Sequence, residues 1–226
     1  MNGEIILRFL GDLRDNNSRE WMQSNKACYR EASAAFEALV EELVAALLPE
    51  EPALAGLCPK NTVFRMNRDT RFSRDKAPYH TAFRAHISPG GRAPVPVGYY
   101  LHIMPRGCFL GGGLFASGWK EATAGIRDAI AEDGAAFDQI VKAKPFSEAF
   151  QLQGEMLKNV PRGYAPEHPF GEYLRHKSWF VEAPFPDEML NRPEAFYGFA
   201  LEKCAAMRPF HQYLNEALKG VTMPGR

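Results

Sequence analysis

The chain has 226 residues, of which 46% are apolar and 24% charged, proportions typical of a folded globular protein rather than a disordered one. Its 27 basic and 27 acidic residues cancel, which argues against a protein whose whole surface coats nucleic acid or an acidic membrane. The apolar runs are too short for a secretion signal or a membrane span, and the four cysteines form no CxxC pair. The composition therefore predicts a cytoplasmic protein, without a membrane partner, whose cysteines are thiols.

Two helices are predicted between Asn17 and Pro49. Asn17 is placed to cap a short helix over residues 19–25, because Glu20 follows three residues later. An amphipathic helix is expected over Lys26–Leu48, where apolar residues recur at intervals of three and four, and Pro49 ends it.

In the middle of the chain, the hydrophobic pattern changes to a period of two residues. Apolar and polar residues alternate in segments bounded by proline and glycine, which predicts an antiparallel meander over residues 62–69, 80–87, 97–104 and 108–115. The run Gly111–Gly113 lacks the spacing of a phosphate loop and indicates a bulge or a close backbone approach instead. Two further strands are expected at residues 150–157 and 178–182.

Helical patterns return in the last half of the chain. Ser117 is a suitable N-cap for a helix over 119–132, and further helices are predicted over 134–143, after His168 and over 193–218, where Pro209 should kink or divide the helix. No repeat, low-complexity segment or linker interrupts the chain. The sequence therefore predicts one α+β domain over residues 1–226, with an antiparallel sheet of about four to six strands packed against N- and C-terminal helices.

Positive charge is concentrated in one window. Residues 60–92 hold eight Lys or Arg and two Asp, a surplus of six positive charges in a chain that is neutral overall. If the predicted strands are neighbours, their polar residues share one face, with the intervening loop at its rim. The candidate ligand-binding residues are Arg65, Asn67, His80, Arg84, Tyr100 and His102 on this face, and Arg68, Arg71, Lys76 and Tyr79 at the rim.

These side chains suit an anion. Guanidinium groups bind phosphate or carboxylate oxygens through two hydrogen bonds, and tyrosine and histidine add directional donors. The pattern predicts a site for a small phosphorylated or carboxylated molecule, in a binding domain or an enzyme, without indicating a catalytic residue. A testable consequence is that Arg65, His80, Arg84 and His102 point to one side of a sheet, with Phe64, Phe83 and Leu101 on the other side.

Two alternatives stay open. Asp69 and Asp75 could pair with the arginines and brace a long loop, which would make the cluster structural. The domain could also be a non-catalytic interaction module for protein or nucleic acid, with nucleic acid the less favoured partner. The sequence leaves the oligomeric state open.

The histidines do not indicate a metal site. His80 and His86 would lie about 20 Å apart on one strand, too far to share an ion, and the chain contains no HExxH or Cys–His spacing. No metal and no cofactor is predicted.

Several motifs are similar to those of a known family. In this order, "FLGDLRDNNSREWMQSNKACYREA", "RMNRDTRFSRDKAPYHT", "VPRGYAPEHP" and "HKSW" resemble the bacterial and fungal family called domain of unknown function 2461. The resemblance covers nearly the whole chain, and its most specific part is the Arg-Asp-x-Arg-Phe-Ser-x-Asp-Lys-x-Pro-Tyr pattern that ends at Tyr79. It implies a single α+β domain and no particular activity, ligand or catalytic residue. The chain departs from the pattern with Met22 in place of Phe and His80 in place of Lys; because either residue at position 80 can carry positive charge, the second difference favours charge binding over acid–base chemistry.

Overall fold

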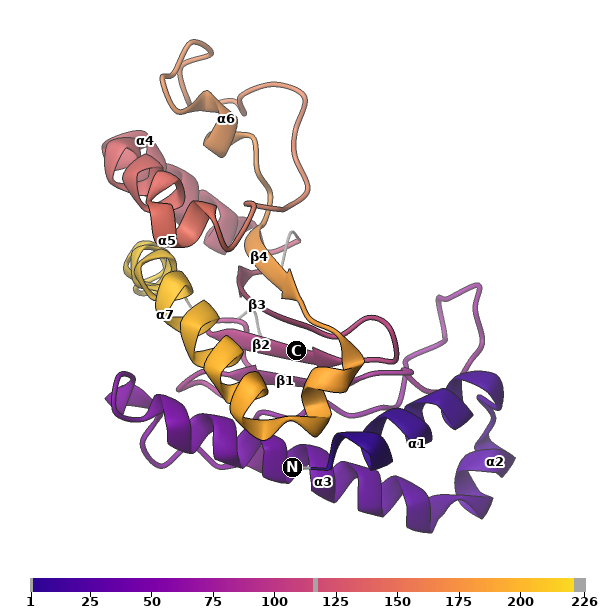
Figure 1. Cartoon of the computed structure of the whole chain (residues 1–226). Coiled ribbons are helices and arrows are strands. Elements are labelled where there is room, and N and C mark those ends of the chain that lie inside the picture. The colour runs from indigo at the N-terminus through magenta and orange to yellow at the C-terminus, as the bar shows by residue number, and fades with distance from the viewer. Residues whose placement is uncertain (1, 116–117, 222–226) are drawn as a thin grey trace. The chain divides into compact units, whose positions relative to one another are not determined.

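The computed structural model describes residues 2–115 and 118–221. Four strands form one antiparallel sheet in the order β1 (Phe83–Ile87), β2 (Tyr99–Ile103), β3 (Phe109–Leu114) and β4 (Trp179–Pro184) (Figure 1). Helices precede and follow the strands in the chain, so the prediction of an α+β fold around an antiparallel sheet is confirmed.

The chain divides into two units. One comprises residues 1–92, 100–110 and 184–201, and the other comprises residues 93–99, 111–183 and 202–226. This division does not test the single-domain prediction, because β3 contributes residues to both units.

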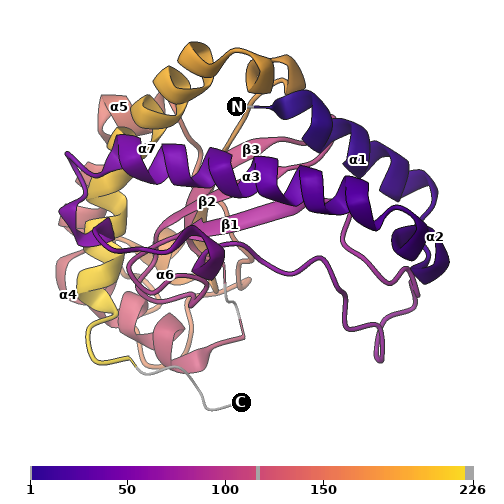
Figure 2. The same ribbon diagram turned by 90° about the horizontal axis from the view of Figure 1, so that it is seen from below.

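The first unit contains α1 (Gly3–Asp15), α2 (Arg19–Ser24) and α3 (Lys26–Leu47), with short 3-10 helices η1 (Pro52–Leu54), η2 (Pro59–Asn61) and η3 (Asp187–Asn191). Figure 2 shows α1 beside α3, and α3 contacts β1. Helix α1 was not predicted, although its buried residues Ile6, Phe9, Leu10 and Leu13 recur at helical spacing. Together, α1 and α3 bury the apolar face of β1.

Residues 62–69 do not form the predicted strand. Two isolated bridges, Val63–Ala85 and Asn67–Tyr79, pair this segment with the chain before and within β1. Three residues (64–66) separate the bridges on one side and five (80–84) on the other, so residues 80–84 bulge and no continuous ladder can form. For the same reason β1 begins at Phe83 rather than at residue 80.

The second unit contains α4 (Lys120–Lys142), α5 (Lys144–Ser147), α6 (Gly171–Leu174) and the last part of α7 (Pro193–Ala217). Helix α4 includes a non-helical residue, Asp133, at the position where the sequence predicts one helix to end and the next to begin. Pro209 lies inside α7, which continues past it. The predicted cap Ser117 lies outside the described residues.

Residues 150–157 also fail to form a regular strand. They make only the isolated bridges Gln153–Phe180 and Met156–His176. Gly154 between them has a φ of +144°, a conformation that turns the chain out of a strand. Within residues 2–115 and 118–221, no helix has both the length and the apolar composition needed to cross a bilayer.

Candidate functional site

The polar face of β1 and β2 carries three of the predicted site residues. On β2, Tyr99, Leu101 and Ile103 are buried, whereas Tyr100 and His102 are half-buried. On β1, Arg84 is half-buried between the buried residues Phe83 and Ala85. Because side chains alternate along a strand, Arg84, Tyr100 and His102 lie on the face opposite the core, as the alternation predicts.

Phe64 lies on this polar face, and its predicted position beside Phe83 is wrong. The guanidinium carbon of Arg84 lies 5.5 Å from the centroid of the Phe64 ring, and the Phe64 and Tyr100 ring centroids are 6.0 Å apart. The bridge between Val63 and buried Ala85 places these two residues on the core face, so the next pair along the chain, Phe64 and Arg84, lies on the polar face. A guanidinium over a ring face is also electrostatically favourable.

The Phe109 ring of β3 packs against Tyr100 and His102. The His102 and Phe109 rings stack with centroids 4.6 Å apart and planes at 11°, and the Tyr100 and Phe109 centroids are 6.1 Å apart. We call this group the Arg84 cluster; its members, all half-buried, are Phe64, Arg84, Tyr100, His102 and Phe109.

The guanidinium of Arg84 has few partners. Its Nη2 donates to the backbone oxygen of Arg65 at 3.4 Å, which is a long hydrogen bond. Its Nε is buried and makes no hydrogen bond to the described residues, and none of their carboxylates forms an ion pair with Arg84. Since buried polar groups in native proteins nearly always have a partner, Arg84 is equipped to hold an acceptor.

Two histidines near Arg84 have lowered pKa values. Burial, together with the charge of Arg84, lowers the pKa of His102 to about 4. Burial, Arg84 and Arg68 also lower the pKa of His80. Both histidines are therefore neutral at pH 7, and each neutral ring can offer one N–H donor.

His80 also lines a shallow pocket. It has a volume of about 460 Å³ and is lined by Arg14, Asn17, Arg68, Asp75, Ala77, Tyr79, His80 and Thr81. We call it the Arg68 pocket. His80 lines this pocket and is close enough to Arg84 and Arg68 for their charges to lower its pKa.

Asn17 helps to form this pocket and does not cap α2 as predicted. The cap is Ser18, whose hydroxyl accepts a hydrogen bond from the Trp21 amide. Asn17 instead donates to the Tyr79 carbonyl at 2.9 Å and accepts from the Tyr79 amide at 3.1 Å. These two bonds fasten the end of the arginine-rich loop to the start of α2.

The loop cations mostly bind within the loop itself. Arg71 forms an exposed ion pair with Asp69 at 2.6 Å, and Arg68 pairs with Asp75 and donates to the Ala77 carbonyl. Lys76 donates to the Thr70 carbonyl at 3.0 Å. These are the contacts that the bracing alternative requires.

The structure thus brings together only part of the predicted set. Arg84, Tyr100 and His102 meet on the sheet face, and Arg68, Tyr79 and His80 line the Arg68 pocket. Arg71 and Lys76 bind within the loop, while Arg65 and Asn67 are exposed. Phe64 and Phe109 were not predicted as ring partners, nor were Arg14 and Asn17 predicted as pocket residues. The alternation of residues 108–115 gives a signal for Phe109, which lies between buried Cys108 and Leu110.

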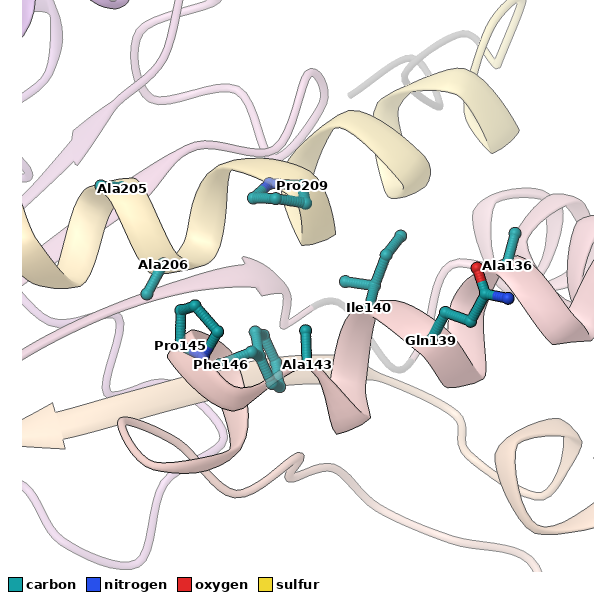
Figure 3. A pocket seen from close by; sticks show the side chains of 9 residues that line it. All are labelled: Ala136, Gln139, Ile140, Ala143, Pro145, Phe146, Ala205, Ala206 and Pro209. Atoms are coloured by element: carbon teal, nitrogen blue, oxygen red, sulfur yellow. The ribbon is translucent and has the colours of Figure 1, made fainter.

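A second pocket has a different character. It has a volume of about 420 Å³ and lies between α4, α5 and α7 (Figure 3), lined by Ala136, Gln139, Ile140, Ala143, Pro145, Phe146, Ala205, Ala206 and Pro209. Gln139 is the one polar side chain of this lining and no lining residue is charged, so the pocket does not suit the anion that the sequence predicts.

The pKa of His102 leads to a pH-dependent stability. The folded-state value of about 4 lies below the ordinary value of 6.5, so between these values the unfolded chain binds a proton that the folded chain does not. Stability contributed by neutral His102 is therefore present above about pH 6.5 and lost as the pH falls toward 4. Because part of the ring is in water, we expect a loss of about 1–2 kcal/mol rather than the full value of the shift.

His102→Phe retains a ring beside Phe109 and removes the titrating group, so it is the matched control for this effect. Urea unfolding at pH 7 and pH 4.5 should show a larger loss of stability in the parent than in His102→Phe. Equal losses would show that His102 is not held neutral by its surroundings.

The fold and the Arg84 cluster define an α+β protein with a cationic, ring-lined sheet face. The family model described as "Conserved hypothetical protein (DUF2461)" matches residues 5–213, so the chain belongs to this family, as the resemblance indicated. No curated protein and no solved structure matches the chain.

Proposed function

We propose that this protein is a cytoplasmic domain that binds a small anionic molecule, bearing a phosphate or a carboxylate, at the Arg84 cluster. The observation that carries the proposal is the guanidinium of Arg84. Its Nε is buried without a hydrogen-bond partner among residues 2–115 and 118–221, and none of their carboxylates pairs with it. Two exposed cysteine thiols, Cys28 and Cys58, support a reducing compartment.

An anion would give Arg84 both a hydrogen-bond acceptor and a compensating negative charge. A phosphate or carboxylate oxygen accepts charge-assisted hydrogen bonds from a guanidinium, and these are stronger than bonds between neutral groups. The half-buried surroundings reduce screening by water and so strengthen the attraction. His80 and His102, held neutral, supply further donors without adding charge repulsion to the empty site.

The loop arginines fit the bracing role better. Asp69 and Asp75 already bind Arg71 and Arg68, which leaves less uncompensated charge for a polyanion. This pairing also disfavours nucleic acid as the partner, because binding to it depends on many cations that contact phosphates. We therefore assign Arg84, His80 and His102 to the proposed site, with Arg68 contributing to its positive field, and Arg71 and Lys76 to the support of the loop.

Thermal unfolding of three proteins tests the proposal: the parent, Arg84→Gln and Arg71→Gln, each with and without inorganic phosphate and a panel of small phosphorylated and carboxylated compounds. A compound at a hundred times its Kd should stabilise the parent by about 2.7 kcal/mol, which corresponds to roughly 5–10 °C for a chain of this size. Arg84→Gln should lose this shift, whereas Arg71→Gln, which removes the same charge at an exposed position, should retain it.

The unliganded variants provide a second readout. Without anions, Arg84→Gln should melt at or above the parent temperature, since it removes a cation that pairs with no carboxylate of the described residues and whose Nε is buried without a hydrogen-bond partner. The proposal is contradicted if no compound shifts the parent, or if Arg84→Gln responds as strongly as the parent does.

A further inference from the structure

We infer that the anion bound at the Arg84 cluster is joined to a planar aromatic ring, as in an aryl or benzyl phosphate, a nucleotide or an aromatic carboxylate. This inference rests on the proposed anion site and specifies the class of ligand that it takes.

A continuous row of rings leads away from the guanidinium. The row begins with Phe64, 5.5 Å from the guanidinium carbon of Arg84, and continues to Tyr100 with centroids 6.0 Å apart. From Tyr100 it reaches Phe109 at 6.1 Å, and His102 stacks on Phe109 at 4.6 Å. Every side chain of the Arg84 cluster other than Arg84 itself is therefore a ring.

The two faces of β2 differ in a way that core packing does not require. The buried face includes the aliphatic side chains Leu101 and Ile103, which are 0% exposed. The opposite face presents Tyr100 and His102, which are half-buried and keep part of their surface in water. Flat groups that remain partly exposed beside a cation provide a stacking surface next to a charge-binding group.

The distances match a ligand with adjacent charged and planar parts. An anion that accepts hydrogen bonds from the guanidinium of Arg84 lies next to the Phe64 ring, whose centroid is 5.5 Å from the guanidinium carbon, and the Tyr100 ring is 6.0 Å farther on. A ring attached to that anion can therefore reach both side chains without leaving the sheet face. Stacking of a flat ligand group on protein rings typically changes affinity by about fivefold to 150-fold.

The test compares two ligands of equal charge, benzyl phosphate and butyl phosphate, by isothermal titration calorimetry with the parent protein. Benzyl phosphate should bind on the order of tenfold more tightly. In Phe64→Leu the ratio of the two Kd values should fall toward one, because the binding of benzyl phosphate weakens more than the binding of butyl phosphate. Phe72→Leu is the matched control, because Phe72 is 95% exposed and lies outside the Arg84 cluster, and it should retain the preference.

The outcomes separate the inference from the proposed function. If the parent binds both phosphates equally, the aromatic preference is overturned and the anion site stands. If it binds neither, the anion site itself is overturned. A preference that survives Phe64→Leu and Tyr100→Leu would show that the ring binds elsewhere, and would overturn the inference. The comparison of the two ligands on the parent needs no variant, so it stands even if a leucine variant fails to fold.

Discussion

Replacement of Phe83 by alanine should destabilise the protein by about 3–5 kcal/mol, the usual cost of removing a buried phenylalanine ring. Phe83 is 1% exposed, and its ring stacks on Phe36 at 5.2 Å and on Phe9 at 6.0 Å. These neighbours come from α3 and α1, so the variant would leave a cavity where both helices meet β1. Urea unfolding followed by tryptophan fluorescence would measure the loss.

Phe72→Ala makes the same chemical change at the opposite extreme of burial. Phe72 is 95% exposed, and Arg71 lies 5.7 Å from its ring. Its removal should change stability by less than about 0.5 kcal/mol. Similar losses in the two variants would show that Phe83 does not occupy the core of its unit.

Gly113→Ala should be the most damaging glycine substitution in β3. Gly113 has a φ of +115°, and a Cβ atom there would lie 2.3 Å from the backbone oxygen of Trp179. An added methyl group would both strain the backbone and force β3 away from β4. We expect a loss of at least about 3 kcal/mol, seen as a fall in melting temperature or as insoluble protein.

Gly198→Ala in α7 is the matched control for this substitution. Nothing lies within 4 Å of a Cβ atom at this position, so the change should stabilise the protein by about 0.5–1 kcal/mol through helix propensity alone. A Gly113→Ala variant that melts with the parent would contradict the close approach of β3 and β4.

Sequence patterns correctly predicted the elements whose structure depends on neighbouring residues in the chain. The alternation of Tyr99, Leu101 and Ile103 with Tyr100 and His102 was correct, because one face of β2 is buried and the other is partly in water. The break between two helical patterns was also correct, and it falls at Asp133. The glycine run in β3 marks a close backbone approach, as expected for glycine in a strand.

Distant contacts explain what the sequence could not predict. Asn17 and Ser18 are adjacent residues that both cap helices well, and the contact with Tyr79, 62 residues away, decides that Ser18 is the cap. The segment of residues 62–69 alternates like a strand, yet unequal spacing between its two bridges prevents a ladder. The register of the Val63–Ala85 bridge places Phe64 beside Arg84 on the polar face, which no local pattern reveals.

The candidate site illustrates the same limit. Arg71 and Lys76 were placed in the predicted site because of the local density of positive charge. In the structure they bind Asp69 and Thr70, two and six residues away, within the loop. Arg84 differs from the loop cations only in its surroundings in the folded protein, which contain rings and neutral histidines rather than carboxylates.

The most direct test of the anion site observes Arg84 itself. In a nitrogen-15 NMR titration of the parent protein, the arginine Nε–H signal that disappears in Arg84→Lys can be assigned to Arg84. Addition of phosphate or benzyl phosphate should shift this signal in a saturable manner, while the Nε–H signal of Arg71, assigned in the same way, stays in place. An Arg84 signal that does not move, or that moves only as much as the signal of Arg71, would contradict the account.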